Sequence, residues 1–194
     1  HRDLHSFPTT TLFRSSTWNA YNDWGGSNHY EGIVDAQSNR FAAELSVCRP
    51  FARGFVSLPH DAPRTLPEIT LPSYSSLYPH MQWAWDNGFS KKYASAGWAM
   101  YERPFVHWAE AMGIELSYLS QRDLHKDPSL LDGAPCVICV GHDEYWSLPM
   151  RQAIDAYLDS GGRVARFAGN FMWQIRVSEN GSQQICHKYR ARLD

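Results

Sequence analysis

A group of polar and aromatic side chains directly follows an apolar run in the second half of the chain. The run Pro135–Val140 (PCVICV) is continuous, which is typical of a strand buried on both faces of a parallel sheet. After Gly141 come His142, Asp143 and Glu144, and then two aromatic residues. Because ligands bind parallel sheets beyond the carboxyl ends of the strands, these side chains are candidates for catalysis or metal binding. The structural alternative is that Asp143 and Glu144 complement the dipole of a following helix.

Two tyrosines around a double glycine form a second candidate group. Tyr21 and Tyr30 lie on either side of Gly25-Gly26, and glycines at these positions permit a loop that folds back on itself. Such a loop could aim both phenols at one point, where phenolate oxygens would be hard, anionic ligands suited to ferric iron. The alternative is that the two rings pack against the protein and leave their hydroxyls in water.

Other catalytic and metal-binding patterns are weak in this sequence. Cys136 and Cys139 have C-x-x-C spacing, but this odd offset within a strand sends the side chains to opposite faces, which disfavours zinc and a disulfide. The sequence has no G-x-S-x-G elbow, no H-E-x-x-H pair and no dinucleotide-binding glycine pattern. A cysteine–histidine hydrolase is a third hypothesis, although no cysteine follows the Pro135–Val140 run at its turn.

Helices and strands alternate around the first candidate group. Ser147 is placed to cap a helix over Leu148–Leu158, and Gly161-Gly162 would follow the end of that helix. The remaining predicted elements are a helix over 104–112, a strand over Ile114–Leu119, a helical turn over 127–131 and a strand over Arg163–Phe167. This order predicts an α/β protein with three layers, in which a mostly parallel, flavodoxin-like sheet is flanked by helices.

The first half of the chain has a less regular pattern. Thr17–Gly32 is polar, aromatic and rich in turn formers, which predicts a loop. Phe41–Val47 predicts a strand that Pro50 ends. Repeated prolines over Ser57–Tyr78 exclude regular elements there, so this segment is expected to run over the surface or to close a site.

The first sixteen residues favour a non-native or disordered lead. His1–Ser16 has no sustained period of 2 or 3.6, and the alternative is a strand that reaches back to about Thr10. We therefore expect one α/β catalytic domain over 17–194, truncated at both ends.

Composition excludes several classes of protein. The chain has 194 residues, of which 43% are hydrophobic and 20% charged, so wholesale disorder is excluded. Its 18 Lys and Arg against 20 Asp and Glu give a net charge of -2, which provides no electrostatic footprint for nucleic acid or an anionic membrane. Its apolar runs are shorter than the roughly 20 residues that span a bilayer. Four cysteines do not make a disulfide scaffold, and a cytoplasmic location is the favoured expectation.

Four motifs in sequence order resemble the C-terminal catalytic region of the N,N-dimethylformamidase large subunit. They are TWNAYNDWGG with SNHYEG, then RPF at 49–51, then GHDEYWSLPMRQAIDAYLDSGG, then AGNFMWQIR. The resemblance extends from about Ser16 to the C-terminus. It implies an α/β fold similar to the class I glutamine amidotransferases, without the nucleophilic cysteine of that fold.

The resemblance also implies a mononuclear ferric iron held by two tyrosines and one glutamate. Glu144 matches the glutamate and Tyr21 matches the first tyrosine. Tyr30 fits the second tyrosine, with a shorter intervening loop in this chain, and Tyr78 or Tyr101 is the alternative.

Further roles follow once this iron site is assumed. His142, Asn170 or Asn22 would donate a hydrogen bond to the oxyanion of the tetrahedral intermediate, or would support the iron ligands. Asp143 would orient a partner rather than bind the metal.

The resulting hypothesis is an iron-dependent amide hydrolase. An open position on the cation would lower the pKa of bound water from 15.7 towards roughly 7, and the resulting metal-bound hydroxide would attack a small amide carbonyl. The expected partners are a small amide substrate and either a small subunit or further copies of the chain. The alternative is a non-catalytic α/β module that binds a ligand or a partner domain.

Overall fold

The computed structural model describes residues 8–22, 24–30, 42–50, 97–98 and 101–187. The chain divides into two compact units, the first made of His1–Thr17 and Tyr101–Arg176, the second of Trp18–Met100 and Val177–Asp194. The proline-rich segment Ser57–Tyr78 lies outside the described residues, and so does the alternative ligand Tyr78 within it.

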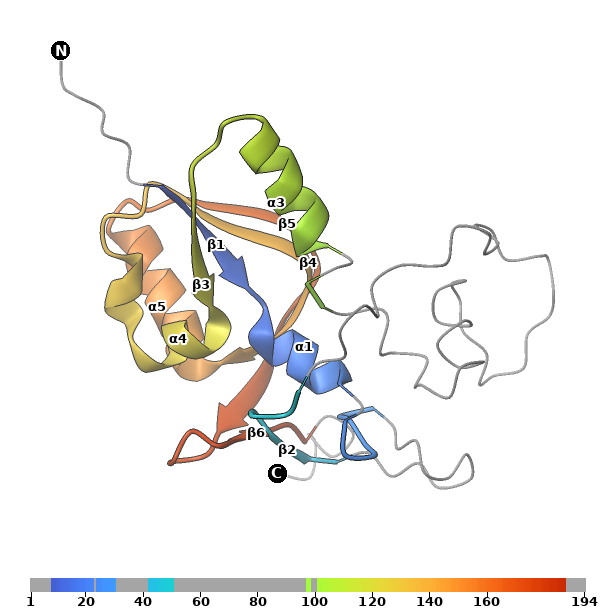
Figure 1. Cartoon of the computed structure of the whole chain (residues 1–194). Helices are drawn as coiled ribbons and strands as arrows, with labels where there is room; N and C mark the ends of the chain where they lie inside the picture. The colour runs from blue at the N-terminus through green and yellow to red at the C-terminus, as the bar shows by residue number, and fades with distance from the viewer. Residues whose placement is uncertain (1–7, 23, 31–41, 51–96, 99–100, 188–194) are drawn as a thin grey trace, which may run out of the picture. The chain divides into compact units, whose positions relative to one another are not determined.

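A parallel sheet organises the first unit (Figure 1). Its strands stand in the order β5 (Val164–Val177), β4 (Val137–Ser147), β1 (Thr9–Phe13) and β3 (Leu116–Ser120). All the pairings between these neighbours are parallel. The predicted α/β class with a mostly parallel sheet is therefore confirmed, whereas the specific likeness to glutamine amidotransferases stays a prediction.

Helices cover both faces of this sheet. One face carries α4 (Gln121–Lys126), the 3-10 helix η2 (Pro128–Leu131) and α5 (Leu148–Asp159). They share a core with the strands, formed by Leu12, Leu119, Leu124, Leu131, Val137, Cys139, Trp146, Met150, Ala153, Ile154 and Tyr157.

Helix α3 (Glu102–Ala111) packs on β3 and β4 outside this core. The chain moves from β1 to β3 through α3, and then returns across β1 to β4 through α4, so right-handed crossovers place the two sets of helices on opposite faces. Figure 1 shows α4 and α5 beside each other and away from α3.

Helix α5 forms where the local signals agree. Its buried residues Met150, Ala153, Ile154 and Tyr157 recur at helical spacing. The Ser147 hydroxyl accepts a hydrogen bond from the Met150 amide at 3.4 Å, which confirms the predicted N-cap.

The start of the chain differs from the expected lead. Strand β1 occupies Thr9–Phe13, in agreement with the alternative of a strand reaching back to about Thr10. It pairs with β3 on one side and β4 on the other. These two neighbours stabilise the strand, although its sequence has no sustained alternation of apolar and polar residues. Helix α1 (Ser15–Tyr21) follows, where the sequence predicts a loop from Thr17.

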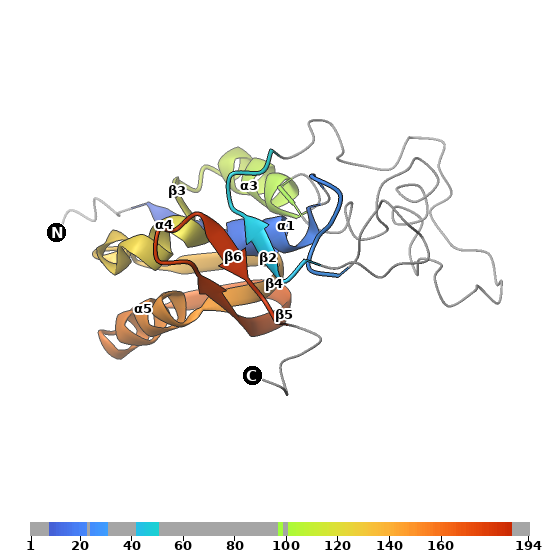
Figure 2. The same cartoon turned by 90° about the horizontal axis from the view of Figure 1, so that it is seen from below.

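The second unit contains most of α1 and an antiparallel ladder. Strand β2 (Glu44–Ser46) pairs with β6 (Gln183–Ile185), and both views show these strands side by side (Figures 1 and 2). The strand predicted over Phe41–Val47 is thus shorter than expected. Among the helices that the structure describes, none is long and apolar enough to cross a membrane.

Candidate functional site

The carboxyl ends of β1 and β4 meet where the direction of the chain across the sheet reverses. Strand β3 lies on one side of β1, and β4 lies on the other. In doubly wound sheets the crevice outside such a switch point is the usual place for a ligand. The residues from His142 to Glu144 stand on β4 at this end, so the topology of the first unit supports the candidate group found in the sequence.

Strand β4 is longer than the sequence predicts. The expected strand ends at Val140, but β4 continues to Ser147 because β5 continues beside it as far as Ile175. The ladder contains a bulge at which His142 pairs with Gly169 and Asp143 with Phe171, so that Asn170 is the extra residue. The polar residues of the first candidate group therefore belong to a rigid strand rather than to a loop after it.

The bulge brings three of the predicted site residues together. The His142 Nε2 atom lies 3.1 Å from a Glu144 carboxylate oxygen, and Asn170 Nδ2 lies 3.4 Å from the same nitrogen. Asn170 has a φ of 33°, a left-handed conformation that asparagine tolerates better than most residues. The side chain of Glu144 is 9% exposed and that of His142 25% exposed, so both are held by the protein and reachable from solvent.

Asp143 is engaged on the other side of the strand. One carboxylate oxygen accepts hydrogen bonds from Gln121 Nε2 and Trp146 Nε1, both at 3.1 Å. Burial raises the pKa of Asp143 to about 6, while the positive charge of Arg14 and the Trp146 hydrogen bond oppose this shift. The role of Asp143 in orienting a partner stays a prediction.

Arg14 and Glu102 are residues of this region that the sequence analysis did not identify. Both side chains are fully buried, and Arg14 Nε donates to a Glu102 oxygen at 2.5 Å. Arg14 Nη1 donates to the backbone carbonyl of His142. The sequence contains one signal for Arg14, because this arginine directly follows a strand rich in threonine. It lies, however, within the segment that the sequence predicts to be a non-native lead.

The backbone of Gly141 lies against the Tyr101 side chain. A Cβ atom on Gly141 would meet the Tyr101 Cβ at 2.4 Å, and the φ of Gly141 is +84°. Tyr101 also lies under Arg14, whose Cζ is 5.3 Å from the centre of the ring. Tyr101, the alternative second tyrosine, therefore packs against the backbone of β4 in the first unit.

The second unit brings the two predicted tyrosines into contact. Tyr21 ends α1, and Tyr30 follows the loop that reverses at Gly25 and Gly26, where φ is 87° and 97°. The Tyr30 hydroxyl lies 2.7 Å from the Tyr21 hydroxyl, and the rings stack with centres 4.6 Å apart. Tyr21 is 5% exposed. The reversing loop thus aims both phenols at one point.

Backbone contacts fix the second arm of this loop. The Asn28 side chain accepts a hydrogen bond from the Tyr30 amide at 2.7 Å. The next residue, His29, is fully buried, and its Nδ1 lies 2.8 Å from the Ala42 carbonyl while its Nε2 lies 3.2 Å from Gln184. These contacts fix the backbone next to Tyr30, and none of them involves the Tyr30 hydroxyl.

Asn22 belongs to the support of the tyrosine loop. Its Nδ2 donates to the Pro50 carbonyl at 3.0 Å, and its Oδ1 accepts from the Trp24 amide at 3.0 Å. Both ends of the amide are therefore used inside the loop, which favours a supporting role over donation to a substrate.

The two groups of predicted ligands stand in different units. Tyr21 and Tyr30 belong to the second unit, and Glu144 belongs to the first. A shared ion bound by all three oxygens stays a prediction. Within the described ranges, no three His, Cys, Asp or Glu side chains are grouped as a metal site.

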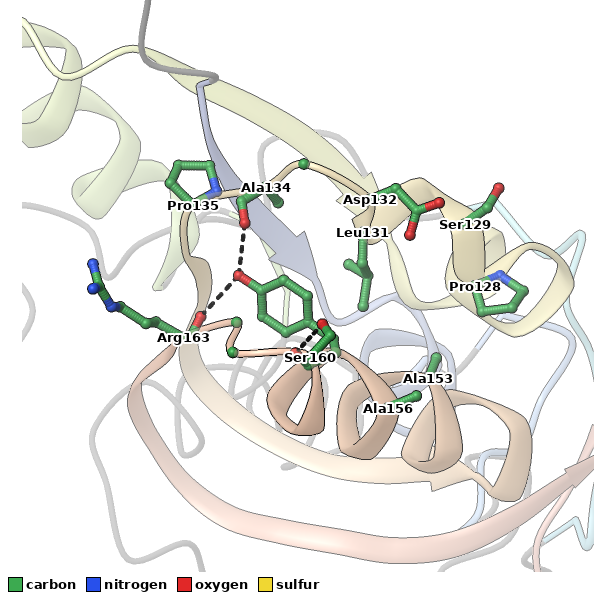
Figure 3. A pocket seen from close by; sticks show the side chains of 14 residues that line it. Pro128, Ser129, Leu131, Asp132, Ala134, Pro135, Ala153, Ala156, Ser160 and Arg163 are labelled. Carbon is green, nitrogen blue, oxygen red and sulfur yellow. Dashed lines mark hydrogen bonds between the residues drawn. The ribbon is translucent and has the colours of Figure 1, made fainter. Parts of the chain in front are cut away.

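A hollow of about 790 Å³ lies at the opposite end of the parallel sheet (Figure 3). Its wall includes Ala134 before β4 and Arg163 before β5, and both carbonyls accept a hydrogen bond from the Tyr157 hydroxyl, at 2.9 and 3.3 Å. Because ligands of parallel sheets bind beyond the carboxyl ends of strands, this hollow is not the candidate site.

Comparison with known families identifies the family of the chain. A sequence model described as N,N-dimethylformamidase beta subunit-like, C-terminal, matches residues 6–193. The chain belongs to this family. The match includes both tyrosines, the His142–Glu144 segment and Asn170, as well as β1 within the segment expected to be a lead. No functionally curated protein matches the chain. The dimethylformamidase-like relationship places amide hydrolysis among the activities to be tested.

Proposed function

We propose that this protein is an iron-dependent amide hydrolase similar to N,N-dimethylformamidase. Tyr21, Tyr30 and Glu144 would hold one mononuclear ferric ion, and the substrate would be a small amide. The observation that carries the proposal is the 2.7 Å separation of the two tyrosine hydroxyl oxygens. Membership of a beta subunit-like family further supports assembly with a small subunit or with other copies of the chain.

The tyrosine pair fits a cation of this type. Two oxygens that hold one small cation must lie close to each other. The hydroxyls of Tyr21 and Tyr30 are 2.7 Å apart, so they would need little rearrangement once deprotonated. Hard, anionic oxygen donors of this kind suit ferric iron.

Glu144 and His142 would complete the ligand set and its support. The Glu144 carboxylate supplies a third anionic oxygen, and its hydrogen bond to His142 Nε2 fixes its orientation. The ion, when bound, would act as a Lewis acid and would lower the pKa of water. His142 would carry the proton from the attacking water to the leaving amine.

Asn170 would stabilise the charge that develops on the amide oxygen. Its amide lies beside His142, and the bulge fixes its backbone. One donor aimed at an oxyanion typically contributes about 2.7–4 kcal/mol to transition-state stabilisation. Substitution of Asn170 by Ala should therefore lower kcat much more than it changes KM.

The decisive experiment measures iron and colour in the purified full chain. We expect about one iron per chain and a visible band from tyrosinate-to-ferric charge transfer, because two phenolates would bind one ion. Tyr21→Phe and Tyr30→Phe should each weaken or shift this band, and Glu144→Gln should reduce the iron content. Tyr118→Phe is the matched control, since Tyr118 is 47% exposed and its hydroxyl donates to Glu110.

Two outcomes would contradict the proposal. Fully folded protein without iron or colour after exposure to ferric salts would favour the non-catalytic module. Loss of amidase activity on treatment with a thiol-blocking reagent would favour the cysteine–histidine hydrolase. We expect that reagent to modify the exposed Cys48 without loss of activity. Cys139 on β4, which contacts Asp143, is 1% exposed, and burial raises the pKa of its thiol.

A further inference from the structure

One buried guanidinium contacts both arms of the tyrosine loop. Arg49 is 8% exposed, and its Nη1 donates to the carbonyls of Trp24 and Ser27, at 3.0 and 2.8 Å. Its Nη2 donates to the carbonyl of Asn19 at 2.6 Å and lies 3.2 Å from the Asn19 side-chain oxygen, which also accepts from Nε at 3.4 Å. These five contacts of the guanidinium all go to α1 or to the reversing loop.

The positions of these acceptors connect Arg49 with both phenols. Asn19 stands two residues before Tyr21 in the last turn of α1, and Ser27 stands three residues before Tyr30. The residue after Arg49 adds a second contact, because the Pro50 carbonyl accepts from Asn22. One short segment thus holds the backbone on both sides of the two tyrosines.

We propose that Arg49 is the positioning residue that sets the separation of the Tyr21 and Tyr30 hydroxyls. This inference rests on the proposed function insofar as the separation serves to bind a metal. The planar fork of arginine can reach acceptors in three directions at once, whereas a lysine has a single nitrogen and cannot replace it. Without the fork, α1 and the loop would no longer share an anchor, and the two hydroxyls would separate.

The test compares Arg49→Lys with Arg103→Lys in the full chain. Both variants keep a positive charge, and Arg103 is an exposed residue of α3, so its replacement controls for the chemical change itself. The first measurement needs no iron: photo-oxidation couples neighbouring tyrosines into dityrosine, and mass spectrometry maps the linkage. We expect a Tyr21–Tyr30 linkage in the parent protein and in the control, and a severalfold lower yield in Arg49→Lys.

The second measurement uses ferric iron. Loss of a residue that supports metal ligands typically weakens metal affinity by roughly 10–100-fold, so we expect a loss of this size in Arg49→Lys together with a shifted charge-transfer band. A purely structural role of Arg49 would lower the unfolding midpoint but leave the band of the folded fraction in place. Unchanged dityrosine yield and unchanged iron binding in folded Arg49→Lys would overturn the inference.

The two proposals fail separately in this design. A parent protein that forms the Tyr21–Tyr30 linkage but binds no iron would end the proposed function, and the linkage yield would still decide the role of Arg49. If Arg49→Lys does not fold, Asn19→Ala takes its place, because it removes the side-chain acceptor and keeps the backbone carbonyl. An intermediate loss of linkage in Asn19→Ala would support the inference, and a yield equal to the parent would overturn it.

Discussion

In each unit, a buried arginine donates hydrogen bonds to the backbone next to the candidate ligands. Arg14 is fully buried and donates both to Glu102 and to the carbonyl of His142, the residue next to the bulge. Arg49 donates to three carbonyls around the tyrosine loop. Burying a charge is costly unless it is paired, so these contacts also tie the stability of each unit to the geometry of its candidate site.

The Arg14–Glu102 pair should be strongly coupled. We expect Glu102→Gln to lower the free energy of unfolding by about 3–5 kcal/mol, because it leaves the buried guanidinium without its counter-ion. The double variant Arg14→Met with Glu102→Leu should cost less than the sum of the two single variants. Urea unfolding of the parent protein, Arg14→Met, Glu102→Leu and the double variant gives the coupling energy.

An exposed ion pair provides the control for this cycle. Arg151 and Asp155 are one helical turn apart on α5, with side chains 52% and 48% exposed. Asp155→Asn should change the free energy of unfolding by no more than about 0.5 kcal/mol, as solvent screens exposed pairs. Additive effects of Arg14 and Glu102 would contradict the coupling.

We expect His125 to make the free energy of unfolding depend on pH. Burial lowers the pKa of His125 below its ordinary 6.5, and the charge of Lys126 lowers it further. The unfolded chain therefore binds a proton more readily than the folded one, so stability is complete above about pH 6.5 and falls as the pH drops through that value. Asp143, whose pKa is raised to about 6, contributes a slope of opposite sign in the same range. The contribution of His125 is therefore the difference between the urea midpoints of the parent protein and of His125→Gln from about pH 5 to 8.

The control for this titration is the exposed His107 on α3. His107→Gln should leave the slope of stability with pH as in the parent protein. A slope in His125→Gln equal to that of the parent protein would assign the pH dependence to other groups. The His125 ring also lies 2.8 Å from the Ser147 hydroxyl that caps α5, so local exchange of the first α5 amides should rise at low pH.

The elements differ in how far the sequence alone could predict them. Helix α5 was predictable because its cap, its apolar spacing and its terminal glycines all act within a few residues. Strand β1 and helix α1 were not, because their residues lack a period of their own and are stabilised by strands and loops distant in the sequence. The end of β4 was placed too early for the same reason: its polar residues stay in the sheet because β5 pairs with them.

The candidate site also contains residues that the sequence predicts and residues that it does not. The double glycine made the approach of Tyr21 and Tyr30 predictable, since a reversing loop is a local feature. Arg14 and Arg49 could not be placed from sequence, because each contacts carbonyls of segments whose position only the folded chain defines. The carbonyls that accept these hydrogen bonds belong to the backbone, so the residue types do not reveal them.

Strand β4 packs closely against Tyr101, so a larger residue at Gly141 should disturb the strand. We expect Gly141→Ala to destabilise the first unit strongly, because the new Cβ would meet the Tyr101 side chain at 2.4–2.9 Å and its φ of +84° is unfavourable for alanine. Gly113→Ala is the matched control: its φ is +74°, yet nothing lies within 4 Å of the new Cβ.

The comparison separates backbone strain from steric overlap. Gly113→Ala should cost about 1–2 kcal/mol from strain alone, whereas Gly141→Ala should cost clearly more and should also change the dichroism of the aromatic residues. Thermal and urea unfolding measure both. Equal costs for the two variants would show that Tyr101 moves aside without penalty and does not fix the backbone before His142.

At the scale of the whole molecule, the proposed ion would connect side chains that belong to two compact units. Anything that binds only the folded protein stabilises it by mass action, by about 4.1 kcal/mol when the ligand is present at a thousand times its dissociation constant. If Tyr21, Tyr30 and Glu144 share one ion, this stabilisation must appear in both units. If the tyrosines bind iron without Glu144, it must appear in the second unit alone.

Hydrogen exchange with and without ferric iron distinguishes these cases. We expect iron to slow amide exchange around Tyr30 in the second unit and around Glu144 on β4 in the first, because one ion would restrict both segments. Glu144→Gln should abolish the effect on β4 and weaken it in the tyrosine loop, whereas Tyr118→Phe should leave both unchanged. Slower exchange in the tyrosine loop alone, with β4 unaffected, would separate Glu144 from the metal and would leave the two phenols as an iron site without the carboxylate that the proposed hydrolysis requires.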